Sequence, residues 1–81
     1  MKVTQFKVNN QFAITTDKGE RFFQSYDSVI VKIDTKGKVT LGRHWNYSQT
    51  TAKYRNQFLG ETTKETQAKL DSGEYLYDEN L

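Results

Sequence analysis

The stretch ITTDKGERF, residues 14–22, decides the fold because its central loop sets the register of two strands. The loop Asp17-Lys18-Gly19 has glycine at its third position, where a common three-residue hairpin needs a left-handed residue. Glycine adopts that conformation without steric cost. The loop therefore predicts an antiparallel hairpin. Its expected pairs are Thr16 with Glu20, Ile14 with Phe22 and Phe12 with Gln24.

A second stretch, VIVKIDTKGKVTL at residues 29–41, repeats the same loop chemistry in Thr35-Lys36-Gly37. The pairs expected around this loop are Asp34 with Lys38, Ile33 with Val39 and Val31 with Leu41. In both hairpins opposed residues share a face of the sheet, so the apolar side chains fall together. The agreement between turn chemistry and apolar pattern predicts an antiparallel β-meander.

The first turn, around Asn9-Asn10, admits two registers. A two-residue loop would pair Val8 with Gln11 and would scatter the apolar residues onto opposite faces. A three-residue loop keeps one apolar face, and asparagine tolerates positive φ better than most residues. We expect the three-residue loop. It pairs Val8 with Phe12 and Phe6 with Ile14.

The apolar pattern changes parity part-way along the meander. Even-numbered residues are apolar up to Phe22, and we expect them to face the core, whereas the later apolar set, Val29, Val31 and Ile33, is odd-numbered. A bulge or break within residues 24–28 would account for the change. We expect strands near residues 2–8, 12–16, 20–24, 28–34 and 38–43.

Helical signals follow the strands. Ser48 is a good N-cap because its hydroxyl can accept a hydrogen bond from a free backbone amide. The residues that then recur at helical spacing, up to a stop at Gly60, are Thr51, Tyr54, Phe58 and Leu59. Thr62, with Glu65 three residues later, forms a capping-box pattern for a second helix that ends at Gly73.

The predicted fold is α+β: an antiparallel β-meander of four to five strands followed by one main helix and a short second helix. One domain is expected over residues 1–81, with the meander in 1–43, the helices at 48–59 and 62–72, and an acidic tail at 74–81. The segment EYLYD in the tail suits a last strand or an extended end.

Composition argues against catalysis and metal binding. The chain has one histidine and no cysteine, and it lacks a nucleophile-elbow pattern and a glycine-rich phosphate loop. We therefore expect a protein that is not an enzyme and binds no cofactor and no metal. No apolar run approaches the roughly 20 residues of a membrane span, and no signal peptide is visible. These features predict a cytoplasmic protein that does not contact membranes.

Charge is distributed unevenly along the chain. Residues 1–60 contain 10 basic and 4 acidic side chains, a net charge of +6, whereas residues 61–81 contain 2 basic and 6 acidic side chains, a net charge of −4. A basic body with an acidic end can bind an anion or can screen its own surface.

The segment RHWNYSQTTAKYR, residues 43–55, interleaves basic and aromatic side chains. Such mixtures suit single-stranded nucleic acid and protein interfaces, although Trp45, Tyr54 and Phe58 could instead pack the helix onto the sheet. The candidate partner-binding residues in this segment are Arg43, His44, Trp45, Tyr47, Lys53 and Arg55. The acidic candidates are Asp71, Glu74, Asp78 and Glu79.

Two motifs resemble small proteins of unknown function encoded by phages and prophages of Gram-positive bacteria. One is a Tyr-Ser-x-Thr-Thr-x-Lys-Tyr pattern followed by an aromatic-Leu pair, matched by Tyr47, Ser48, Thr50, Thr51, Lys53, Tyr54, Phe58 and Leu59. The other is a Phe-x-Ser-Tyr-Asp segment, matched by Phe23, Ser25, Tyr26 and Asp27. The resemblance covers roughly residues 22–60 and implies an accessory protein of a mobile element in a bacterial host.

Two functional hypotheses follow. The first is a non-catalytic protein that binds a host or phage protein, for example as an inhibitor of a bacterial defence system such as a CRISPR nuclease. Such nucleases hold basic channels for nucleic acid, and the acidic residues 71–79 could occupy one. The alternative is a nucleic-acid-binding protein that uses residues 43–55. An open sheet edge could also pair with a second copy to form a homodimer.

Overall fold

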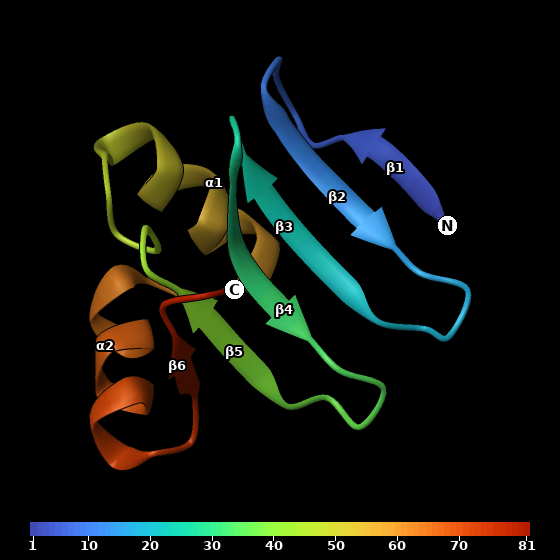
Figure 1. Ribbon diagram of the computed structural model, residues 1–81. Helices are drawn as coiled ribbons and strands as arrows, with labels where there is room; N and C mark the ends of the chain where they lie inside the picture. The colour runs from blue at the N-terminus through green and yellow to red at the C-terminus, as the bar shows by residue number, and fades with distance from the viewer.

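The computed structural model, which describes residues 1–81, is an α+β fold with one six-stranded sheet and two helices (Figure 1). The strands are β1 (Lys2–Gln5), β2 (Gln11–Thr15), β3 (Arg21–Ser25), β4 (Ser28–Ile33), β5 (Val39–Gly42) and β6 (Leu76–Asp78), and the helices are α1 (Gln49–Leu59) and α2 (Thr63–Ser72). The strands lie in the sheet in the order of the sequence. The meander is therefore confirmed, with one more strand than expected.

The sixth strand comes from the acidic tail. β6 pairs in parallel with β5, whereas every other neighbouring pair is antiparallel. A parallel pair needs a crossover connection, and α1 and α2 supply it. The tail therefore supplies one edge strand of the sheet, at the end opposite to β1.

The registers of the two glycine hairpins are confirmed. Ile14 lies opposite Phe22, and Ile33 lies opposite Val39. Gly19 and Gly37 have φ of 93° and 87°, which is the left-handed conformation that their loop position requires. Local loop chemistry was therefore sufficient to set both registers.

The expected register of the first turn is wrong by three residues. Gln5, and not Val8, lies opposite Phe12. The chain leaves the sheet after Gln5 and makes a longer loop, in which Lys7 and Asn10 both have positive φ. The physical reason is the ring of Phe6, which leaves the strand pattern and packs against the core.

The face assignment of β2 and β3 is also wrong. Phe23 is fully buried on the side of the helices, together with Gln11 and Ser25, while Phe12 and Phe22 are half-buried on the other side. The change of parity occurs in β4 and not within residues 24–28. Phe23 pairs with Val31 and Gln24 with Val29, which leaves Ile30 as the extra residue of a bulge. Both Ile30 and Val31 enter the core.

Helix α1 packs on the sheet through an aromatic seam formed by Phe6, Phe23 and Phe58. The Phe23 and Phe58 rings stack at 5.5 Å, and Phe6 meets each of them edge-on at 5.8 Å. The helix begins at an N-cap serine, Ser48, and Thr51 in its first turn forms a buried hydrogen bond of 3.0 Å with Ser25. Both helices lie behind the sheet in Figure 1, and neither is long and apolar enough to cross a membrane.

Candidate interaction surfaces

One face of the sheet is not covered by the helices, and apolar side chains stand there among polar ones such as Gln5, Gln24, Lys32 and Thr40. One row crosses all six strands through Val3, Ile14, Phe22, Lys32, Thr40 and Leu76. Opposed residues in neighbouring strands share a face, so this row lies on the side away from Phe23. We call Val3, Phe12, Ile14, Phe22 and Val29 the open sheet face.

The open sheet face is partly accessible to solvent. Val3 is 52% exposed, and the other four residues are half-buried. None of the five belongs to the hydrophobic core cluster or packs against it. An antiparallel sheet with one solvated face normally carries polar side chains there, so the five apolar side chains on this side indicate a surface suited to contact with another molecule.

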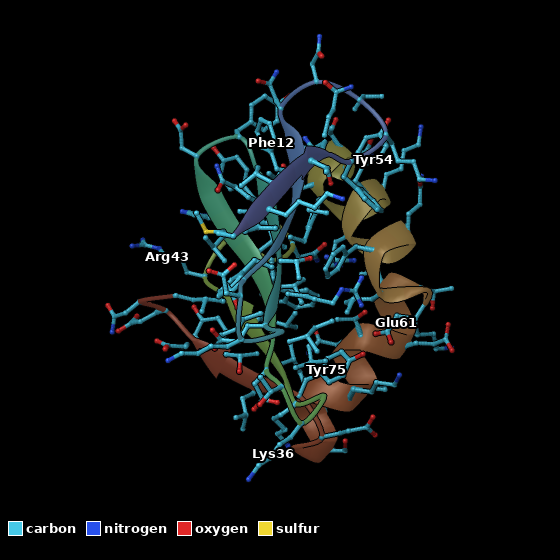
Figure 2. All side chains as sticks on the ribbon, turned by 90° about the vertical axis from the view of Figure 1, so that its right-hand side faces the viewer. Phe12, Lys36, Arg43, Tyr54, Glu61 and Tyr75 are labelled. Atoms are coloured by element: carbon cyan, nitrogen blue, oxygen red, sulfur yellow. The ribbon has the colours of Figure 1, made fainter.

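Charged groups lie within the same row as the apolar residues of the open sheet face, and beside it. Lys32 lies in the row itself and forms an ion pair of 3.6 Å with Glu20. Figure 2 shows Arg43 projecting on the side of the sheet opposite to Tyr54 and Tyr75. Arg43 is exposed and forms no ion pair.

A second surface feature lies where the β3–β4 turn meets the connection between β5 and α1. A cavity of about 230 Å³ is lined there by Tyr26, Asp27, Ser28, His44 and Tyr47. We call this group the tyrosine pocket. The imidazole of His44 meets the ring of Tyr47 edge-on at 5.1 Å. Tyr26 and Tyr47 are 54% and 76% exposed, so both rings are available to a ligand.

Tyr26 holds an unusual backbone conformation. Its φ is 53°, a left-handed value that non-glycine residues other than Asn and Asp rarely adopt. Two hydrogen bonds of 2.7 Å secure the turn: the Tyr26 amide donates to the carbonyl of Asn10, and the Gln24 side-chain amide donates to the carbonyl of Tyr26. The tyrosine is thus presented at the tip of the hairpin at some conformational cost.

Arg55 does not belong to the surface, contrary to its inclusion among the candidate partner-binding residues. It is fully buried. Its guanidinium donates to the carbonyl of Trp45 and to the side chains of Asn46, Asn56 and Thr63. Burial lowers its pKa, while the charge of Glu61 acts in the opposite direction. Arg55 therefore ties α1 to its flanking segments from inside.

The remaining basic and aromatic candidates have different surroundings. Trp45 is half-buried and packs against the core, with the Arg55 guanidinium over its ring at 5.0 Å. Lys53 is exposed, with its ammonium 5.3 Å from the Tyr54 ring centre. His44 and Tyr47 are brought together in the tyrosine pocket. Some residues of the segment 43–55, such as Trp45 and Arg55, therefore pack inside the protein, while others, such as Tyr47 and Lys53, lie on its surface.

The acidic candidates do not gather in one place. Asp71, Glu74, Asp78 and Glu79 are all exposed. Glu74 lines a cavity of about 550 Å³ next to two lysines of the β4–β5 turn, Lys36 and Lys38, whereas Asp78 lies opposite Gly42 at the far end of β6. These charges are therefore distributed over the last turn of α2, which holds Asp71, the connection before β6 and the end of β6.

A buried network that the sequence analysis missed surrounds Glu61. The carboxylate accepts hydrogen bonds from the Lys69 ammonium at 2.8 Å, the Tyr75 hydroxyl at 2.7 Å and the Thr66 hydroxyl. We call these four residues the Glu61 network. All four lie between Gly60 and β6, so the network fastens α2 to its neighbours. No alternation or spacing in the sequence signals it.

The Glu61 network changes the pKa values of its members. Burial tends to raise the pKa of Glu61, but hydrogen bonds from Lys69, Thr66 and Tyr75 outweigh it, so the pKa lies below its usual value. Burial and the hydrogen bond to Glu61 raise the pKa of Tyr75 to about 12. The bond to Glu61 also raises the pKa of Lys69. A carboxylate held charged by three donors is poorly suited to accept a proton.

Comparison with protein families gives one match. The model of a family of unknown function (DUF8033) matches residues 1–74 of the chain. The chain belongs to this family. The matched region contains the open sheet face, the tyrosine pocket and all of the Glu61 network except Tyr75. No curated protein and no solved structure matches the chain.

Two of the surface residues could have been found from the sequence. Tyr26 and Asp27 stand directly between two strands. A bulky residue in a tight turn is a signal, because turns favour glycine and asparagine. Phe12 and Phe22 gave no such signal, since an apolar residue in a strand is as consistent with a place in the core as with a place on an open face.

Proposed function

We propose that this protein is a non-catalytic binding module that docks onto another protein through the open sheet face. The observation that supports this most is the apolar row on the uncovered side of the sheet. Valine, isoleucine and two phenylalanines lie there, away from the core cluster. Protein interfaces have apolar, aromatic-rich centres with polar rims, and here the apolar side chains are accompanied by the ion pair of Lys32 with Glu20.

The biological setting belongs to the same proposal. The motif resemblance favours an accessory protein of a phage or prophage, acting in the cytoplasm of a bacterial host as an inhibitor of a defence system. The target would be a host protein, and a CRISPR nuclease is one candidate. The acidic candidates lie in different elements, with Asp71 in α2, Glu74 before β6 and Asp78 at the end of β6. This distribution speaks against a compact nucleic-acid mimic and in favour of docking through the sheet.

The test uses two neighbours on β1 that point to opposite sides. Val3→Lys places a charge on the open sheet face, and Thr4→Lys, its matched control, places the same charge on the other side. Both residues are exposed, so both variants should keep the melting temperature of the wild type. Tagged protein is used to capture partners from bacterial lysate, and each variant is assayed for inhibition of defence nucleases.

The proposal requires that a protein captured by the wild type and by Thr4→Lys be lost with Val3→Lys. Phe22→Thr, which removes a ring from the same face while keeping strand propensity, should lose it as well. Equal capture by all variants would remove the open sheet face from the proposal. Recovery of no specific partner by the wild type, with no effect on defence nucleases, would contradict the protein-binding function.

Nucleic-acid binding is the second candidate, and one observation favours it. Phe12 and Phe22 lie on an open sheet, the arrangement in which some RNA-binding domains stack bases on aromatic rings. The burial of Arg55 weighs against it, because it removes a cation from the segment 43–55. Binding of labelled oligonucleotides should weaken steeply with salt if phosphates are contacted. Absence of binding at low salt would reject this candidate.

A further inference from the structure

We propose that the tyrosine pocket binds a cationic side chain, arginine first of all, presented by a protein partner. The inference rests on the proposed function only for the source of the cation. The pocket itself lies at the tip of the β3–β4 hairpin, apart from the row that defines the open sheet face. It therefore adds a specific anchor for a partner that docks on the open sheet face.

The aromatic groups of the pocket suit a cation. Tyr26 and Tyr47 expose about half and three quarters of their surface, and His44 contributes a third ring against Tyr47. The face of an aromatic ring carries negative electrostatic potential, which attracts ammonium and guanidinium groups. Guanidinium is planar and weakly hydrated, so it stacks on such rings better than ammonium does.

A carboxylate without an ion-pair partner completes the site. Asp27 lines the cavity and is exposed. The three ion pairs of the protein join the N-terminus to Asp17, Lys32 to Glu20 and Lys69 to Glu61. Asp27 takes part in none of them, so its charge is available for a guanidinium, which carboxylates bind through paired hydrogen bonds. An anionic ligand would instead meet this charge as a repulsion.

The size of the cavity fits one head group. Its volume is about 230 Å³, below the roughly 300 Å³ at which pockets for drug-sized molecules begin. A side chain inserted from a partner needs only this much room, because the remainder of the partner stays on the surface.

The conformation of Tyr26 supports a role in binding. Its positive φ would be less costly for asparagine or glycine, yet the ring at this position is largely exposed and adds little to the core. A strained residue that contributes little packing is a candidate for function. Tyr26→Asn should therefore keep or raise the stability of the fold while it removes the ring.

The experiment is a titration followed by amide chemical shifts at pH 7.5, with Nα-acetyl-arginine methylamide as the probe. We expect saturable shifts for Tyr26, Asp27, Ser28 and Tyr47. Nα-acetyl-glutamine methylamide, which is similar but neutral, should cause no saturable shift. Acetate, a small anion, should also cause no saturable shift. The lysine analogue should bind, but more weakly than the arginine probe.

Variants connect the response to the pocket. Asp27→Asn and Tyr26→Asn should each weaken the affinity for the arginine probe by about fivefold or more, the equivalent of one lost cation–aromatic or charged contact. The matched controls are Asp17→Asn, an exposed acid outside the pocket, and Tyr77→Ala, an exposed tyrosine on β6. Both controls should bind the probe as the wild type does.

The inference is overturned if the arginine probe causes no saturable shift, if the glutamine probe acts equally, or if Asp27→Asn binds unchanged. Failure here is distinguishable from failure of the proposed function. If the wild type and Asp27→Asn capture the same partner equally while Val3→Lys loses it, docking through the open sheet face is supported and the role of the tyrosine pocket as an anchor is rejected. If the probe binds but no partner is captured, cation binding by the tyrosine pocket is supported and the proposed protein-binding function is contradicted.

Discussion

The two helices are attached to the rest of the protein by different balances of apolar and polar contacts. Helix α1 lies on the aromatic seam, where three phenylalanine rings meet at 5.5–5.8 Å. Helix α2 contributes one buried threonine and packs Leu70 against the core, and it is also fastened by the Glu61 network of charged and hydroxyl groups. The apolar contact is non-directional and insensitive to pH, whereas the polar one depends on geometry and protonation. The two attachments should therefore fail under different conditions.

The aromatic seam should show the largest effect. Phe23→Ala empties a fully buried site and removes two ring contacts, so we expect a loss of about 3–5 kcal/mol in the free energy of unfolding. The measurement is denaturant unfolding at neutral pH. Phe22→Ala is a matched control, because it deletes the same side chain from the adjacent, half-buried position on the other face. Equal losses for both would mean that the helix side is not the principal core.

The Glu61 network should show an intermediate effect. Glu61→Gln keeps the shape but removes the charge that Lys69, Thr66 and Tyr75 share, so we expect a loss of about 1–3 kcal/mol. Glu74→Gln, an exposed acid in the same region, should change the free energy by less than about 0.5 kcal/mol. A neutral result for Glu61→Gln would show that the network adds no stability over an uncharged equivalent.

Acid should separate the two attachments. The pKa of Glu61 is lower in the folded than in the unfolded protein, so its contribution is present above the ordinary value of 4.5 and is lost as pH falls through the lowered folded pKa. Wild-type stability should therefore decline over this window. Glu61→Gln should show a shallower decline, and Phe23→Ala the same slope as the wild type. Thermal unfolding from pH 6 to pH 2 measures this; parallel curves for wild type and Glu61→Gln would contradict it.

The smallest effect is expected on the outer face of α1. Lys53→Ala removes an exposed side chain, so stability should stay within about 0.5 kcal/mol. Unfolding curves that overlay those of the wild type would meet this expectation. A larger loss would show that the contact of Lys53 with the Tyr54 ring stabilises the helix more than exposed contacts of this kind usually do.

Prediction from the sequence succeeded where the deciding residues are close together. The caps of both helices are as expected: Thr51 donates its backbone amide to Ser48, and Thr62 and Glu65 form a complete capping box. These features depend on residues three or four positions apart. Within the candidate surfaces, the structure brings His44 and Tyr47 together in the tyrosine pocket, since both precede the helix in a short connection. Their role in partner binding stays a prediction.

Prediction failed where distant residues compete for the same space. The buried state of Arg55 depends on Trp45, Asn46 and Thr63, which surround it only after α1 and α2 have docked. The apolar parity of β2 and β3 was equally consistent with either face, because both faces carry apolar side chains. The open sheet face could therefore not be separated from the core by alternation.

By itself, the sequence determined the meander, the registers of its two glycine hairpins and the positions of both helices. Each of these follows from loop geometry or capping within a few residues. Only the tertiary structure decided which face of the sheet the helices cover, where Phe6 leaves its strand, and that the acidic tail closes the sheet as a parallel strand. Those choices depend on which arrangement buries the most apolar surface between residues far apart in the sequence. A pattern of neighbouring residues does not report that total buried area.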